Sequence, residues 1–339
     1  MSGLRIEPLD ARDDAAFDAY YDVYAGSLAP LGEIASPWMR EEYREIVREE
    51  ATRRWNGAFV GTVDGETVAA GFVWTPLLDN LDSAHVDVHV LPAHQRRGHG
   101  SAMLARLEQE AAARGRTLFD AEASWAYDVG ADGHGAAGAA FLRARGYALG
   151  LSDVKRSLPM PVAGALLDEL AAEAAPHHGA FELRSFVGRV PDELAQGWAL
   201  LDASLVTEAP TGELDRDPAA PDVAAMRESE ANSVLQGRTK FNTVALDAAG
   251  AVVAYTDIAV STHDPGTAYQ WGTLVQRDAR GHRLGMAVKV ANLKLLLAEG
   301  PGPDRVVTYN AEINSHMVGV NDRLGFVPVA RLGEFQKRT

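Results

Sequence analysis

Cysteine is absent from this sequence of 339 residues. Its absence excludes disulfides, thiolate metal ligands and a cysteine nucleophile, so the fold must depend on packing alone. No apolar run approaches the roughly 20 residues that cross a bilayer. The N-terminal residues have neither the basic start nor the apolar stretch of a secretory signal. We therefore expect a cytoplasmic protein with no membrane partner.

Basic residues are scarce compared with acidic ones. The chain has 32 Lys and Arg against 47 Asp and Glu, a formal net charge of −15. Nucleic-acid binding depends on clustered Lys and Arg, so we expect no nucleic-acid partner. An acidic surface favours a cationic small molecule such as an amine, although such a charge can also serve solubility alone. The length predicts two domains of ordinary size.

The same order of elements occurs twice along the chain. Each half begins with a short strand and an amphipathic helix, continues with a hairpin around a glycine-bearing turn, and then has a strand that leads into a second helix. Repeats of about 150 residues are far longer than solenoid units, so two similar α/β domains are indicated. We predict an N-terminal domain over residues 1–158, a linker over 159–180 and a C-terminal domain over 181–339.

A glycine-rich turn connects a strand to a helix within Gln95–Gly115. Gly98 and Gly100 let the backbone curl and a ligand approach closely. The helix start provides free N–H groups and the positive end of the dipole, which together favour phosphate. The turn lacks the pattern of a P-loop and the third glycine of a dinucleotide fingerprint, so a dinucleotide enzyme is a weaker alternative. Two glycines by themselves are also consistent with a structural turn that binds no ligand.

The wider pattern V-H-V-L-P-x-x-Q-x-x-G-x-G resembles the acyl-CoA signature of the GNAT superfamily of N-acyltransferases. Arg145–Tyr147 and Leu324–Phe326 resemble the late glycine–aromatic mark of that superfamily, and the tandem layout is similar to that of mycothiol synthase. The resemblance implies two tandem GNAT-like domains of the α/β (α+β) class. Each would have a mixed, mostly antiparallel central sheet flanked by helices.

The resemblance also implies acetyl-CoA as cosubstrate and a reaction without a metal. The turn would hold the pyrophosphate, and the preceding strand would pair with the pantetheine arm and direct an N–H near Val88 at the thioester oxygen. The implied CoA-binding residues are Val88, His89, Val90, Gln95, Arg96, Arg97, Gly98, His99, Gly100 and Ser101 in the first half, and Val275, Arg280, Gly281, Gly285 and Asn314 in the second.

Candidate bases lie on the strand before the turn. His85 and Asp87 share one face of this strand, where the resemblance places the group that deprotonates the amine. A half-exposed strand with polar residues facing water would give the same alternation. Glu122, on the next strand, is a third candidate that could act through a water molecule. The equivalent strand of the second half has Gln270 but no base.

Both halves depart from the superfamily pattern. The late tyrosine that would protonate the leaving thiolate is replaced by Leu142 and by Asn321. The second turn has Arg283 where the first has Gly98, so we predict one tight CoA per chain, in the N-terminal domain. The predicted function is acetyl transfer from acetyl-CoA to a small amine by direct attack. The missing tyrosines leave a non-catalytic acyl-CoA-binding or sensor protein as the alternative.

Overall fold

The computed structural model describes residues 3–339, which form two compact units. Unit 1 contains the described residues up to Asp153 together with 211–216 and 330–339. Unit 2 contains Val154–Pro210 and Asp217–Val329. This division differs from the expected contiguous domains over 1–158 and 181–339, because each unit takes a strand from the other half of the sequence.

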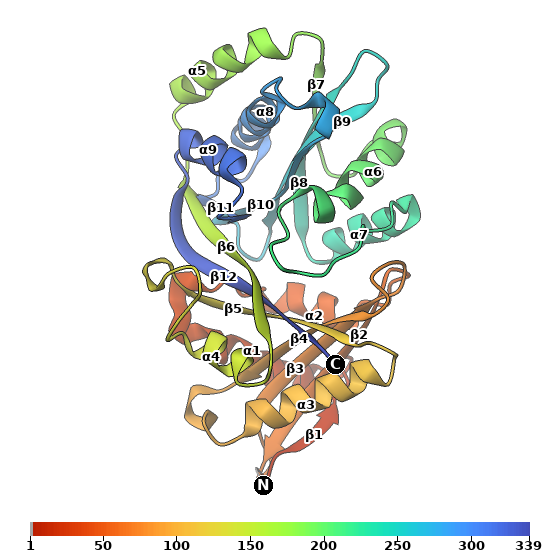
Figure 1. Cartoon of the computed structure of the whole chain (residues 1–339), viewed down its shortest axis with the longest axis vertical. Helices are drawn as coiled ribbons and strands as arrows, with labels where there is room; N and C mark the ends of the chain where they lie inside the picture. The colour runs from red at the N-terminus through yellow and green to blue at the C-terminus, as the bar shows by residue number, and fades with distance from the viewer. Residues whose placement is uncertain (1–2) are drawn as a thin grey trace. The chain divides into compact units, whose positions relative to one another are not determined.

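Unit 1 is a mixed sheet with helices on both faces (Figure 1). Its strands follow the order β1-β2-β3-β4-β5-β12, and neighbours are antiparallel except for the parallel pair β4 and β5. Its elements are β1 (Arg5–Pro8), α1 (Asp14–Leu28), α2 (Arg40–Arg48), β2 (Arg54–Val63), β3 (Glu66–Pro76), β4 (Ser83–Val90), α3 (His99–Ala112), β5 (Leu118–Ala126) and α4 (Ala137–Arg143).

The last strand of the unit 1 sheet comes from the C-terminus of the chain. In β12 (Val327–Arg338), Ala330–Arg338 pairs antiparallel with Ala126–Leu118 of β5. Strand β6 (Ala148–Pro159) directly follows α4, yet it continues into unit 2 and lies beside β11 there. Unit 1 is therefore completed by Ala330–Arg338, far beyond the predicted domain boundary at residue 158, and no local sequence pattern predicts this pairing.

Side-chain alternation along β3 separates the two faces of unit 1. Ala69 and Val73 belong to the core that contains Met103 and Leu107 of α3. Ala70 and Phe72, which alternate with them, belong to a second core with Tyr20 of α1 and Tyr43 of α2. Helix α3 therefore covers one face of the sheet, and α1 and α2 cover the other.

Unit 2 has the strand order β7-β8-β9-β10-β11-β6. Its central neighbours β8, β9 and β10 are antiparallel, whereas β10 and β11 are parallel. Helix α8 packs on one face and α6 on the other. The elements are α5 (Gly164–Ala174), β7 (Glu182–Val187), α6 (Asp192–Glu208), α7 (Val223–Leu235), β8 (Arg238–Leu246), β9 (Val252–Ser261), β10 (Thr267–Val275), α8 (Leu284–Glu299), β11 (Arg305–Ala311) and α9 (Ser315–Leu324).

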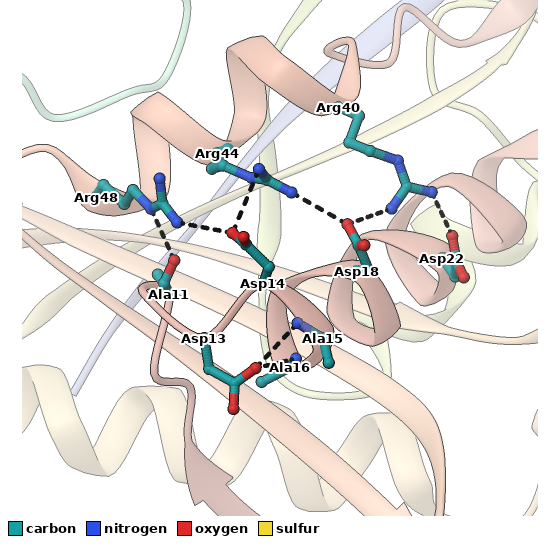
Figure 2. A network of polar contacts seen from close by, with 10 residues as sticks. All are labelled: Ala11, Asp13, Asp14, Ala15, Ala16, Asp18, Asp22, Arg40, Arg44 and Arg48. Carbon is teal, nitrogen blue, oxygen red and sulfur yellow. Dashed lines mark hydrogen bonds and ion pairs between the residues drawn. The ribbon is translucent and has the colours of Figure 1, made fainter.

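Helices α1 and α2 are joined by a ladder of ion pairs. Acidic residues repeat every four positions on α1 and basic residues do so on α2, so each set forms one stripe along its helix. Figure 2 shows how the stripes interlock: Arg40 with Asp18 and Asp22, Arg44 with Asp14 and Asp18, and Arg48 with Asp14 and the Ala11 carbonyl. The ladder holds α2, and with it Tyr43, over the sheet.

We expect Asp18→Asn to lower the free energy of unfolding by about 0.5–1 kcal/mol, because Asp18 bonds two arginines but is half-exposed. The loss should shrink at high salt, which screens such pairs. Asp22→Asn, which removes a single partner, should cost less. Denaturant unfolding at two salt concentrations measures both variants. A larger loss for Asp22→Asn, or no salt dependence, would contradict the ladder.

Candidate active site

Strands β4 and β5 diverge at the centre of unit 1. Their parallel pairing runs from Ser83–Leu118 to His85–Asp120, and among the described residues it extends no further. Leu91 donates its N–H to the Val68 carbonyl on the β3 side (3.1 Å). Because N–H directions alternate along a strand, the N–H of Val88 faces the opposite, diverging side. The open edge of β4 therefore offers backbone donors and acceptors to an extended ligand.

The glycine-rich turn continues directly from this open edge. Gly98 has a φ of +88° and caps α3 without a side-chain hydrogen bond, so the first N–H groups of α3 keep their donor capacity. Gln95 donates from Nε2 to the Val90 carbonyl (3.1 Å), which ties the turn to the end of β4. At Gly100 a Cβ would lie 3.4 Å from the Phe141 ring. The predicted anion site is thus a helix N-terminus beside an open strand.

Arg145 adds a positive charge to this site that the sequence reasoning did not assign. Its guanidinium donates to Ser101 Oγ in the first turn of α3, with Nε at 3.2 Å. The same guanidinium lies 5.3 Å from the centre of the Phe141 ring. The only signal in the sequence was its position before the Gly146–Tyr147 mark.

Asp87 and His89 form a pair on the face of β4 covered by α1. His89 Nε2 lies 2.8 Å from Asp87 Oδ2, and His89 is 7% exposed. Burial acts to raise the pKa of Asp87, but the charge and hydrogen bond of His89, the charge of His85 and the Val88 amide together hold it below its usual value. His85 is not part of this pair; its ring stacks on Trp74 at 5.5 Å. Asp87 is thus a weaker base than its position suggested.

Carboxylates gather beside His85 on the same face of the sheet. Glu122 and Glu334 stand opposite each other in the β5–β12 register, and Gln336 Nε2 donates to Asp120 Oδ1 (3.0 Å). Arg216 is ion-paired with Glu334 and is the basic residue of the group. The carboxylates of this acidic group are Asp120, Glu122, Asp153 and Glu334.

The protein surroundings raise the pKa values of carboxylates in this acidic group. The side chain of Glu122 stays accessible to solvent, but the protein around it raises its pKa by desolvation, and Glu334 and Asp87 add to the rise against the charge of His85. Desolvation also raises the pKa of Asp120. The pKa of Asp153 reaches about 7 through desolvation and the charges of Glu334 and Glu122. Sequence reasoning found Glu122 but not Asp153, Arg216 or Glu334, because they come from distant segments.

A bulge between Gln270 and Thr273 distorts the corresponding strand of unit 2. Strands β10 and β11 also pair over only three residues, from Thr267–Arg305 to Tyr269–Val307. Here, however, the Gly272 N–H donates to Asp257 Oδ1 (2.7 Å), and Asp257 is buried and ion-paired with Lys240 (2.8 Å). A Cβ at Gly272 would lie 2.5 Å from the Tyr255 hydroxyl. Gly272 is therefore tied to β9, directly before Thr273, the position that corresponds to Val88.

The predicted phosphate loop of unit 2 has internal partners as well. Arg280 pairs with Glu208 (2.7 Å), and Arg283, the N-cap of α8 with a φ of +52°, pairs with Glu173 of α5 (3.4 Å). His282 Nδ1 contacts the His177 carbonyl (3.1 Å). The two arginines that would meet a phosphate are therefore held by carboxylates.

The other residues predicted for unit 2 have structural roles. Asn314 accepts a hydrogen bond from the Met317 N–H (3.2 Å) and caps α9. Gln270 is buried and donates to Thr256 Oγ1 and to the Asp257 carbonyl. Val275 accepts from Arg280 Nε (3.3 Å), as Val90 does from Gln95 in unit 1. Gly281 lies in the loop with a φ of +87°, and Gly285 lies in the first turn of α8, where a Cβ would be 3.8 Å from Val275 Cγ2.

Residues 3–339 contain neither a metal-binding cluster nor a membrane-spanning helix. No group of three or more His, Cys, Asp or Glu side chains is arranged to hold a metal ion. No helix in that range combines the length and apolarity needed to span a bilayer.

A mixed sheet whose central parallel strands diverge beside a glycine-capped helix is the arrangement of the GNAT class of acyltransferases. The model of the acetyltransferase (GNAT) family matches residues 17–138. A search of the curated proteins found no match.

Solved structures match the whole chain. A tandem GNAT protein from the clavulanic acid biosynthesis pathway is similar over 99% of this chain and 98% of that one, with 26% identity and a TM-score of 0.79. A GCN5-related N-acetyltransferase from Sphaerobacter thermophilus is 15% identical over 99% and 95% of the two chains, with a TM-score of 0.66. Residues 17–138 match the GNAT family, the whole chain has the tandem GNAT fold, and the predicted fold class is confirmed.

Proposed function

We propose that unit 1 transfers an acetyl group from acetyl-CoA to a small amine by direct attack, without a metal. One arrangement carries this proposal: the open edge of β4 leads into the Gly98 turn, and carboxylates line the sheet beside the same edge. An extended thioester and a cationic acceptor each find a matching surface there.

The donor would lie along β4 and the turn. The pyrophosphate would accept hydrogen bonds from the first N–H groups of α3, with Arg96, Arg97 and Arg145 adding charge. The pantetheine arm would pair with Val88–Val90, and the Val88 N–H would donate to the thioester oxygen as negative charge develops on it. His99 and Ser101 belong to the first turn of α3.

The acceptor would bind at the acidic group, with Glu122 as the general base. Glu122 has a raised pKa and is solvent-accessible, two properties that suit a base near neutral pH. Asp87 has a lowered pKa and a fixed partner in His89, so we assign it a different role. The nitrogen attacks the thioester carbon, Glu122 accepts a proton from it, directly or through water, and the C–S bond breaks to release the thiolate.

Unit 2 would not catalyse acyl transfer. A bulge interrupts β10 just before the position that corresponds to Val88, and Arg280 and Arg283 are paired with Glu208 and Glu173. These features favour the second candidate, a non-catalytic domain, for this half of the chain alone.

Acetyl-CoA and a panel of small amines, with free thiol as the readout, test the proposed function. We expect thiol release that depends on the amine, and a kcat lowered about 100-fold or more in Glu122→Gln, with little change in acetyl-CoA affinity. Because a carboxylate must be ionised to accept a proton, the rate should rise with pH and level off above the raised pKa values of this group, near 7 for Asp153.

Glu299→Gln, at the end of α8 in unit 2, is the matched control and should behave as the wild type. The proposal fails if no amine stimulates thiol release. Normal turnover in Glu122→Gln would exclude Glu122 as the base and turn attention to His85 and Asp120.

A further inference from the structure

The hydrogen-bond partners of His89 determine how many protons lie in the contacts of its two ring nitrogens. Ser27 Oγ donates to the Tyr24 carbonyl one turn earlier in α1 (2.8 Å). A serine hydroxyl has one proton, so Ser27 Oγ can only accept in its second contact, at 2.7 Å from His89 Nδ1. The proton in that contact therefore belongs to Nδ1.

The other ring nitrogen then needs a proton too. His89 Nε2 and Asp87 Oδ2 lie 2.8 Å apart, and two lone pairs cannot face each other at hydrogen-bond distance. With one proton already on Nδ1, the Nε2–Oδ2 contact contains a second proton. The pair is either imidazolium with carboxylate or imidazole with carboxylic acid. Both descriptions have the same net charge and one transferable proton.

This proton lies at the proposed acyl site. The Asp87 side chain is 40% exposed and directly precedes Val88, whose N–H would serve the thioester oxygen. His89 itself is buried, with both nitrogens engaged and the edge of the Tyr24 ring against it. Asp87 is therefore the member of the pair that a bound thioester can reach.

The site also lacks the usual source of a proton for the departing sulfur. Leu142 stands at the late tyrosine position of unit 1 and is 5% exposed within the core. A CoA thiolate that leaves beside β4 has no phenol at that position to protonate it.

We propose that Asp87 passes the proton it shares with His89 to the departing CoA thiolate, and that His89 and Ser27 are positioning residues that keep this proton in place. The inference rests on the proposed function of unit 1. As the C–S bond breaks, its electron pair goes to sulfur, and the proton moves from the Nε2–Oδ2 contact through Asp87 to form the thiol.

The Asp87–His89 pair then takes up a new proton, because without one the lone pair of His89 Nε2 would face the Asp87 carboxylate at hydrogen-bond distance. The amine proton held by Glu122 can return through water, so proton uptake and release balance over one turnover. Thiolates are basic enough, with pKa values near 8.5 in cysteine, to accept a proton from imidazolium or a carboxylic acid.

The test uses the full chain and two truncated acetyl donors, the thioester of N-acetylcysteamine and that of an acidic aryl thiol. His89→Gln and Ser27→Ala should lower kcat with the alkyl thioester, His89→Gln by about tenfold or more, but should lower it less than about twofold with the aryl thioester, since an acidic thiol leaves without protonation. Ser204→Ala is the control, because Ser204 makes the same bond to a carbonyl one turn earlier in unit 2.

Equal losses with both donors would overturn the proposal and leave His89 a purely structural residue. No amine-dependent turnover by the wild type with these donors or acetyl-CoA would instead refute the proposed function. A proton NMR spectrum provides a readout independent of activity: the shared proton should give a far-downfield resonance that is absent from His89→Gln and Asp87→Asn. Its absence from the wild type would also overturn the proposal.

Discussion

Phe335→Ala is expected to lower the free energy of unfolding of unit 1 by about 3–5 kcal/mol, although only four residues follow it in the sequence. Phe335 is fully buried in the core that contains Met103, Leu107 and Trp125, and it meets Trp125 edge to face at 6.4 Å. Its removal leaves a cavity that the paired strands β5 and β12 cannot close.

Hydrogen exchange resolved by peptide measures this effect in each unit. Phe335→Ala should increase exchange in α3 and β5 of unit 1. The matched variant Phe326→Ala, nine residues earlier, removes a buried ring from the core of unit 2 and should increase exchange in α8 instead. Val327→Ala, at an exposed position, should change neither. Loss of protection in unit 2 with Phe335→Ala would contradict the placement of β12 in the sheet of unit 1.

Gly98→Val is expected to weaken CoA binding more than tenfold, about 1.4 kcal/mol. Gly98 has a φ of +88° and caps α3, and a β-branched residue strongly disfavours that backbone conformation. If the turn relaxed to relieve this strain, several N–H donors would move away from the pyrophosphate at the same time. The fold should survive, because the strain is confined to an exposed turn.

Calorimetric titration should find one tight CoA per wild-type chain. The second loop gives the matched control: Gly281 has a φ of +87°, so Gly281→Val imposes similar strain where Arg280 and Arg283 are already paired with carboxylates. It should leave CoA affinity unchanged. Two equal sites in the wild type, or loss of binding in Gly281→Val alone, would move the donor site to unit 2.

Local patterns in the sequence predicted the parts of this protein. Alternation indicated the β4 face of His85, Asp87 and His89, and glycines before an amphipathic helix indicated the turn at Gly98. These features depend on neighbours a few residues apart, so spacing alone carries them. The internal repeat likewise predicted two similar folds.

Only the tertiary structure decided which strands complete each sheet. Strands β6 and β12 both follow a helix and a glycine turn, and either could pair with β5 on local grounds. Strand partners are chosen by core packing, here by Phe335 against Trp125, which no local pattern records.

The chemistry of the candidate site depends on the same long-range pairing of strands. Glu334 and Arg216 reach Glu122 only because distant segments fold onto unit 1, and these neighbours shift the acidity of its carboxylates. Ser27 meets His89 across 62 residues, and a hydrogen bond between two such side chains has no signature in either segment. Sequence alone thus determined the elements and the turn at Gly98, whereas tertiary packing decided which charged groups and hydrogen-bond partners surround them, because these depend on contacts between residues far apart in the chain.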